Sequence, residues 1–169
     1  PKAGVVLSQE NKQEYSKRGR LLDCLQSAAT QYTHWLETEE VGKRMQAYLL
    51  KRGLSAQTIK DWQVGYGPEK WTALLEYLRA QKFSEAEIFA AGLAGRSERG
   101  SAYDRFRDRI VFPIRDVSGS IIAFTARVNP EKAETIPGGK YINSPQTELY
   151  DKSRVLFALD KATKAIKER

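Results

Sequence analysis

The spacing of apolar residues changes half-way along this chain, and that change limits the folds open to it. Between Tyr15 and Leu36, apolar side chains recur every three or four residues, which is the stripe of an amphipathic helix. From Arg109 to Arg115, and again over residues 120–127, the residues are mostly apolar, β-branched or aromatic, as in buried strands. We therefore predict an α+β fold: helices come first, a small and largely antiparallel sheet follows, and a helix closes the chain.

Local signals predict where the helices of the first half begin and end. Residues 38–40, Thr-Glu-Glu, predict a helix start, because acidic side chains stabilise a first turn. Gly53 predicts the end of that helix and Ser55 the start of a short one. A further helix is expected around residues 71–78. Residues 84–87, Ser-Glu-Ala-Glu, form a capping box ahead of another helix.

Turn residues organise the second half. Residues 92–100 predict a loop, and residues 116–119, Asp-Val-Ser-Gly, predict the turn of a hairpin. A second, exposed loop is expected over residues 129–139, with an extended segment at residues 141–142. Apolar residues at helical spacing predict the closing helix: Val155, Leu156, Leu159, Ala162 and Ile166.

Composition excludes several classes of protein. With 41% hydrophobic residues the chain has enough apolar surface to form a core, so a disordered tail is excluded. No apolar run approaches the roughly 20 residues of a membrane-spanning helix. One cysteine and one histidine cannot build a disulfide framework or a Cys/His zinc site within this chain, and a reducing compartment is the simplest setting.

The two ends favour a piece of a longer polypeptide. The chain starts with Pro1 rather than Met, and no signal-peptide pattern follows. It stops within residues 164–169, which have helical character and no cap.

Positive charge is concentrated in two stretches. The net charge is +7, and residues 96–115 and 150–169 each carry a surplus of three positive charges. If the first stretch is extended, Arg105, Arg107 and Arg109 point the same way and could cradle phosphates. Alternatively, they pair with Asp104 and Asp108 as structural scaffolding. The residues alone leave both interpretations open.

Residues 127–152 combine the side chains that bind nucleic acid. Cations neutralise phosphates, amides and hydroxyls bond phosphate or sugar, and tyrosine faces stack on unpaired bases. An ordinary polar loop is the equal alternative. The candidates are Arg127, Lys140, Tyr141, Asn143, Ser144, Thr147, Tyr150 and Lys152.

Five blocks occur together and in order. They are Leu50-Lys-Arg-Gly-Leu54, Val64-Gly-Tyr-Gly-Pro68, Tyr103-Asp-Arg-Phe-Arg-Asp-Arg-Ile-Val-Phe-Pro-Ile-Arg-Asp116, Ala123-Phe-Thr-Ala-Arg127 and Lys140-Tyr-Ile-Asn-Ser-Pro-Gln-Thr-Glu-Leu-Tyr-Asp-Lys152. Over about residues 35–160 the chain resembles the N-terminal subdomain of the RNA polymerase core of bacterial DnaG-type DNA primases. On this basis we divide it into a helical preface, residues 1–36, and that subdomain, residues 37–169.

The resemblance implies an enzyme that makes short RNA primers on single-stranded DNA from ribonucleoside triphosphates in the bacterial cytoplasm. It implies no catalytic residue in this chain, which alone should be inactive. Lys140 and Lys152 would be supporting cations near the active site. Residues that match the family's template groove are Arg52, Arg127, Lys140, Tyr141 and Lys152, with Asn143 and Ser144 following more weakly.

The rest of such a primase would supply the remaining parts. A toprim subdomain would hold Mg²⁺ or Mn²⁺, a zinc ribbon would hold structural Zn²⁺, and a C-terminal domain would bind the replicative helicase. The partners of this chain would be the template strand, the RNA–DNA hybrid and the nucleoside triphosphates. Departures from the family are Ala123, Thr125, Ala126 and Ser153 at common glycine positions, and a longer insertion over residues 131–138. The alternative function is a non-enzymatic, basic adaptor that binds nucleic acid or protein; a plasmid- or phage-borne primase is a further alternative.

Overall fold

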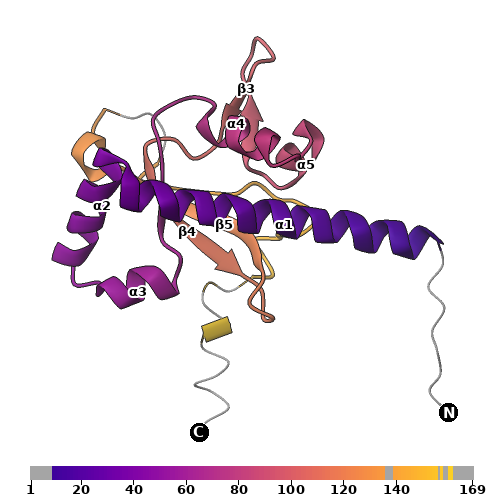
Figure 1. Ribbon diagram of the computed structural model, residues 1–169, viewed down its shortest axis with the longest axis horizontal. Helices are drawn as coiled ribbons and strands as arrows, with labels where there is room; N and C mark the ends of the chain where they lie inside the picture. Colours follow the sequence, from indigo (N-terminus) through magenta and orange to yellow (C-terminus); the bar gives the residue numbers. More distant parts are fainter. Residues whose placement is uncertain (1–8, 136–138, 156, 158–159, 162–169) are drawn as a thin grey trace, which may run out of the picture.

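The computed structural model describes residues 9–135, 139–155, 157 and 160–161 (Figure 1). The elements, in chain order, are α1 (Gln9–Thr38), α2 (Glu40–Lys51), α3 (Ala56–Asp61), β1 (Gly65–Gly67), α4 (Ala73–Ala80), α5 (Glu85–Ala90), β2 (Ala94–Arg96), β3 (Ala102–Asp104), β4 (Arg109–Arg115), β5 (Ile121–Val128), the short 3₁₀ helix η1 (Pro130–Lys132) and β6 (Tyr141–Asn143). The predicted α+β fold, with helices before an antiparallel sheet, is confirmed. Asp160 and Lys161 are helical, and most of the predicted closing helix lies outside the described residues.

The main sheet has four antiparallel strands in the order β1-β4-β5-β6. Its centre is the predicted hairpin of β4 and β5, with a register shift between Ile114 and Arg115. The turn is held by Asp116, whose Oδ1 accepts hydrogen bonds from the amides of Ser118 and Ser120 at 2.9 and 3.0 Å. Local turn chemistry therefore sets the register of the sheet.

One face of this sheet packs on α1, which crosses the sheet in Figure 1. Gly65 makes the close approach possible, because a Cβ there would lie 2.4 Å from the Cβ of Tyr32. Tyr32 in turn packs edge-on against Phe124, with ring centroids 5.5 Å apart. Leu25, Ala29 and Tyr32, from the predicted apolar stripe, are buried in this core. Residues 21–32 of α1 thus form one hydrophobic core with the sheet.

The opposite face carries a second, smaller core. Met45 and Leu49 of α2 and Ile59 of α3 pack there against Tyr66 and Ile110 of the sheet. Tyr66 and Ile110 are register partners and point to this face. Because side chains alternate along a strand, the next pair, Gly65 and Val111, faces α1. α2 and α3 therefore cover the β1–β4 part of the second face.

Most predicted helix ends match the structure. Gly53 adopts φ +98° at the end of α2, the side chain of Ser55 caps α3, and residues 84–87 form a complete capping box. Thr38 does not start a helix. It is the last residue of α1, where its hydroxyl donates to the carbonyl of His34, and Glu39 is the N-cap of α2. The prediction placed the break between the helices correctly and the capping residue one position early.

The predicted loop over residues 92–100 contains a strand. β2 pairs with β3 as a separate two-stranded sheet. Gly95 lies under the ring of Tyr103, where a Cβ would come within 2.7 Å of the ring. Three-residue strands rich in glycine carry no alternating apolar pattern, so periodicity could not find them. Within the described residues, no helix has the length and apolar character needed to cross a bilayer.

Candidate nucleic-acid interface

The second face of the sheet stays partly open over β5 and β6. Arg127 is the register partner of both Ile110 and Tyr141, and Thr125 is the partner of Asn143, so all of these side chains share one face. Ile110 is covered by the second core, but Arg127, Thr125 and Asn143 are half-buried and Tyr141 is 56% exposed. The sequence thus places a cation, a tyrosine, an amide and a hydroxyl side by side on an accessible surface.

Arg127 is held by a residue from a distant element. Its Nη1 donates a hydrogen bond to the hydroxyl of Tyr48 on α2, and its guanidinium carbon lies 5.0 Å from the centroid of the Tyr48 ring. Such a distance is typical of a cation–π contact. Arg127 is therefore fixed at the junction of α2 with the open face.

Three other predicted cations lie on the surface. Arg52 is the C-cap of α2, Lys140 precedes β6, and Lys152 lies in a turn beyond Tyr150. All three are exposed, and none forms an ion pair with a residue that the structure describes. Lys140 is anchored through its backbone, because its carbonyl accepts the amide of Val128 at 2.9 Å. Their charges are therefore available to a phosphate chain.

Ser144 has a different role from the one predicted. Its side chain is 7% exposed, and its Oγ accepts the amide of Phe124 at 2.9 Å, while its own amide donates to the carbonyl of Phe124 at 2.8 Å. Ser144 thus fastens the end of β6 to β5, and we leave it out of the interface. Asn143 keeps a half-buried side chain on the open face.

Arg105, Arg107 and Arg109 do not form a row. Asp108 adopts φ +48°, so the chain turns between β3 and β4 and the extended geometry on which a shared direction depends is broken. Arg105 donates through Nε and Nη2 to the carbonyl of Asn143 at 3.0 and 2.8 Å, and Arg109, 4% exposed, reaches the carbonyl of Gly139 at 3.4 Å. Arg105 and Arg109 therefore hold the structure together, but their partners are backbone carbonyl groups and not the predicted Asp104 and Asp108.

The neighbouring acids are engaged elsewhere. Asp104 accepts the amides of Leu74 and Leu75 at the start of α4, at 2.7 and 2.9 Å. Asp108 accepts the hydroxyl of Tyr66 at 2.7 Å and lies 3.1 Å from the ammonium group of Lys132. Both carboxylates are buried, and both stabilise the fold.

Arg107 belongs to an aromatic cluster that sequence reasoning missed. Its guanidinium carbon lies 3.8 Å from the ring centroid of Trp71 and 4.9 Å from that of Tyr103. The two rings meet edge to face at 5.8 Å, and Trp71 is 60% exposed. Partial burial lowers the pKa of Arg107 from its ordinary value, yet an arginine stays charged in a protein. An exposed indole beside a guanidinium is a platform on which a base can stack.

The backbone fixes this cluster. The amide of Asp104 donates to the carbonyl of Trp71 at 2.7 Å, and Nη1 of Arg107 donates to the carbonyl of Asp104 at 2.8 Å. We predicted a helix around residues 71–78, which would include Trp71, but α4 begins at Ala73 and Trp71 precedes it. No sequence signal separates an exposed tryptophan from a core one, so the structure was needed to find it.

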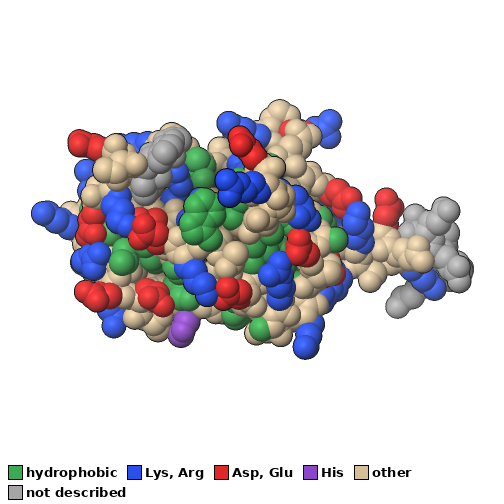
Figure 2. Space-filling model, turned by 90° about the horizontal axis from the view of Figure 1, so that it is seen from above, with side chains coloured by type: hydrophobic (Ala, Val, Ile, Leu, Met, Phe, Trp, Pro, Cys, Tyr) green, Lys and Arg blue, Asp and Glu red, His purple; other side chains and the backbone are tan. Residues whose placement is uncertain are grey.

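The open face and the aromatic cluster are connected. Tyr48 contacts Arg127, Arg127 faces Tyr141 across the strands, and Asn143 lies two residues further along β6. Arg105 then joins the carbonyl of Asn143 to the segment that carries Arg107. We call this path the basic–aromatic strip, and its members are Tyr48, Arg127, Tyr141, Asn143, Arg105, Arg107, Tyr103 and Trp71. Figure 2 looks down on the side of α4 and β3, where hydrophobic side chains are exposed beside Lys and Arg side chains.

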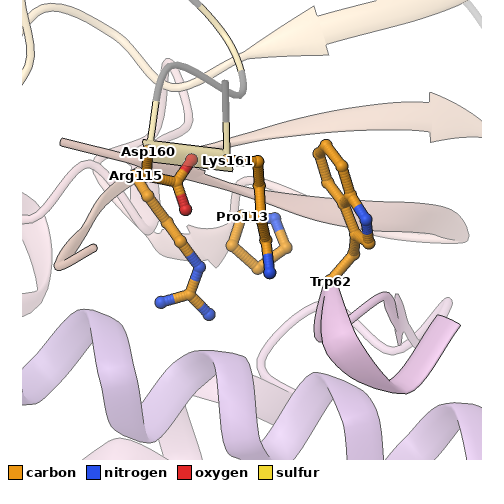
Figure 3. Close-up of a pocket in the computed structure, with 5 residues that line it drawn as sticks. All are labelled: Trp62, Pro113, Arg115, Asp160 and Lys161. Carbon is orange, nitrogen blue, oxygen red and sulfur yellow. The ribbon is translucent and has the colours of Figure 1, made fainter. Parts of the chain in front are cut away.

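A separate hollow lies between the end of α3 and β4. It is lined by Trp62, Pro113, Arg115, Asp160 and Lys161 (Figure 3). The side chain of Lys161 lies between Arg115 and Trp62, 5.8 Å from the centroid of the indole. Phe157 stacks on Trp62 with centroids 5.7 Å apart. Because this hollow shares no lining residue with the basic–aromatic strip, we do not assign it to the interface.

Comparison with known proteins identifies the family. Residues 31–163 match the family model described as DNA primase catalytic core, N-terminal domain. This chain belongs to that primase family. Among curated relatives, it is 41% identical to the DNA primase of Synechocystis sp. over 165 residues, and 36% identical to that of Streptomyces coelicolor over 169 residues. These alignments cover 95% and 97% of the chain but 25% and 26% of the relatives, so the chain spans about a quarter of a primase.

Solved primase structures share the fold. The RNA polymerase domain of Mycobacterium tuberculosis primase DnaG has a TM-score of 0.81 and 32% identity, over 89% of this chain and 48% of that one. A DnaG primase catalytic domain bound to single-stranded DNA has a TM-score of 0.78 and 32% identity, over 89% and 45%. A structure of the zinc-binding and RNA polymerase domains of Aquifex aeolicus primase has a TM-score of 0.78 and 26% identity, over 90% and 36%.

Proposed function

We propose that this chain forms the wall of a primase cleft that holds the single-stranded DNA template and the RNA–DNA hybrid while ribonucleoside triphosphates are joined into a primer. The observation that carries the proposal is the basic–aromatic strip, whose members are linked by contacts and strand pairing from Tyr48 on α2 to Asn143 on β6, and through Arg105 to the segment that holds Arg107 against Trp71. Its partners in the cell would be those of a bacterial replication fork in the cytoplasm.

The chemistry of the strip suits an unpaired polynucleotide. Arg127 of the strip, together with Arg52, Lys140 and Lys152 outside it, would bind phosphates, which gives affinity without sequence preference. Tyr141 is 56% exposed and Trp71 is 60% exposed. Every base can stack on an exposed aromatic ring face. A duplex hides its base faces, so we assign the exposed rings to the unpaired part of the template and the cations to both the template and the hybrid. The DnaG domain that was solved with single-stranded DNA supports this assignment.

We assign the chemical step to another part of a longer primase. Joining nucleotides requires divalent metal ions held by carboxylates. Asp104 and Asp108, the two buried carboxylates in the part of the chain that the structure describes, already bind amides, Tyr66 and Lys132. A toprim subdomain would hold Mg²⁺ or Mn²⁺, and Lys140 and Lys152 would add positive charge near the incoming triphosphate. A zinc ribbon and a helicase-binding domain would complete the enzyme, as the zinc-binding domain of the Aquifex aeolicus primase suggests.

Family membership argues against a non-enzymatic adaptor.

Primer synthesis by the intact protein tests whether the predicted cations serve nucleic-acid binding or only the fold. We expect Arg127→Ala and Lys152→Ala each to lower primer synthesis about tenfold, the loss of one charge-assisted contact, with little change in melting temperature. Lys12→Ala, which removes an exposed lysine from α1, is the matched control and should be neutral. Variants that unfold yet keep full activity per folded molecule would show that these residues only stabilise the fold.

A further inference from the structure

Tyr48 is the residue that determines where the Arg127 guanidinium lies. It comes from α2, 79 residues before Arg127, and it contacts the guanidinium in two ways. The phenol oxygen accepts a hydrogen bond from Nη1, and the ring lies 5.0 Å from the guanidinium carbon. A guanidinium is a planar fork of donors, so one bond to an Nη atom and one ring beneath it restrict both its tilt and its rotation.

The other donors of Arg127 are not satisfied by the fold. Its second terminal nitrogen, Nη2, has no hydrogen-bond partner among the described residues and is not buried, whereas Nε is unpartnered but buried and so is closed to a ligand. No carboxylate that the structure describes forms an ion pair with it either. Arg105 and Arg109, by contrast, are bound to carbonyl groups. Arg127 therefore keeps donor capacity for a ligand, while its orientation depends on Tyr48.

Tyr48 is itself held in place. Its neighbours on α2, Met45 and Leu49, are 1% and 5% exposed in the second core. At the start of the same helix Gly42 lies against α1, where a Cβ would meet the carbonyl oxygen of Trp35 at 2.1 Å. The side chain of Tyr48 is itself partly buried against this second core, which restricts its rotamers. The phenol therefore occupies its position before any ligand arrives.

We propose that Tyr48 is a positioning residue, which orients the Arg127 guanidinium so that its free donors face the phosphates of a bound strand. The inference rests on the proposed function and adds the residue that prepares this contact in advance. Pre-orientation raises affinity because the ordering cost is met on folding and not on binding. An arginine without such a partner would have to be ordered by the strand itself.

A double-mutant cycle on single-stranded DNA binding by the intact protein tests the proposal. The probe is a fluorescently labelled oligodeoxynucleotide, and the variants are Tyr48→Phe, Arg127→Ala and the two combined. We expect Tyr48→Phe to raise Kd about threefold to fivefold and Arg127→Ala about tenfold. The double variant should bind like Arg127→Ala alone, because the phenol acts through the arginine. Tyr15→Phe, on an exposed tyrosine of α1, is the control and should leave Kd unchanged.

The possible outcomes separate the two proposals. If Arg127→Ala weakens binding but Tyr48→Phe has no effect, or adds its full effect in the double variant, the positioning role is wrong and the interface stands. If neither substitution changes Kd, the interface itself is misassigned. If Tyr48 only stabilises the fold, Tyr48→Phe should lower the melting temperature equally in the wild type and in Arg127→Ala. Its effect on Kd should then be additive with that of Arg127→Ala.

Discussion

The carboxylate of Asp104 caps α4 from thirty residues further along the chain, since its two oxygens accept the amides of Leu74 and Leu75 at 2.7 and 2.9 Å. The residue is 3% exposed. The same segment carries Trp71, whose carbonyl accepts the amide of Asp104. One buried acid thus fixes both the start of α4 and the loop that presents the exposed indole.

Asp104→Asn should destabilise the protein, because an amide group can accept only through its single oxygen and would place an N–H group against a backbone donor. We expect a loss of about 2 kcal/mol at pH 7. Burial raises the pKa of Asp104 to about 6. A folded pKa above the unfolded value of about 4 means that the native state binds this proton more tightly, so stability is gained as the pH falls from 6 to 4.

The asparagine variant lacks this titration. The difference in unfolding free energy between the wild type and Asp104→Asn should therefore widen by about 2 kcal/mol between pH 7 and pH 4. Urea denaturation across that range measures it. If the difference in unfolding free energy instead narrows as the pH falls, the hydrogen bonds from the two backbone amides must lower the pKa of Asp104 below its usual value.

Gly65→Ala should destabilise the contact between α1 and β1. The added methyl group would lie 2.4 Å from the Cβ of Tyr32 and 2.6 Å from its backbone carbonyl carbon, so the helix or the strand must move. We expect a loss of about 3 kcal/mol in unfolding free energy. Gly19→Ala is the matched control: Gly19 lies within α1 with nothing inside 4 Å, so alanine there should stabilise the helix by about 1 kcal/mol. Equal effects of the two substitutions would contradict the packing described here.

Trp71 should report directly on the bound strand. It is the exposed member of three tryptophans, and stacking on a base should quench its emission. Trp71→Phe should remove most of the quenching, and Trp71→Ala should weaken binding of single-stranded DNA about tenfold with little effect on stability. Trp62→Phe, at the separate hollow, is the control and should keep the quenching. Undiminished quenching in Trp71→Phe would exclude the indole from the interface.

Sequence reasoning predicted those parts of the fold that local chemistry determines. Gly53 ends a helix because its backbone is left-handed, and Ser84 with Glu87 caps one through contacts three residues apart. The hairpin of β4 and β5 follows from a turn between two apolar runs. The predicted start of the second helix was one residue early, because both threonine and glutamate can lie at a helix end. In the structure Thr38 ends α1 and Glu39 is the N-cap of α2.

The site was only partly predictable, because some of its residues gain their roles through local chemistry and others through contacts with distant parts of the chain. Arg127 and Tyr141 were named in advance and lie opposite each other in the sheet. Tyr48 and Arg107 gain their roles through contacts with distant residues, and such contacts leave no periodic signal in the sequence. Ser144 looked like a binding hydroxyl, but which way a serine points at the end of a short strand depends on the register of that strand.

The salt dependence of single-stranded DNA binding tests the central claim most directly. Arg52, Arg127, Lys140 and Lys152 are replaced together by alanine in the intact protein. The control variant replaces four other exposed cations: Lys12, Arg18, Lys60 and Lys82. If the four predicted cations contact phosphates, the slope of log affinity against log salt should become shallower by roughly 3 in the first variant and stay close to the wild type in the second. Equal slopes in both variants, or a loss of slope in the control alone, would show that the bound strand does not contact the four predicted cations.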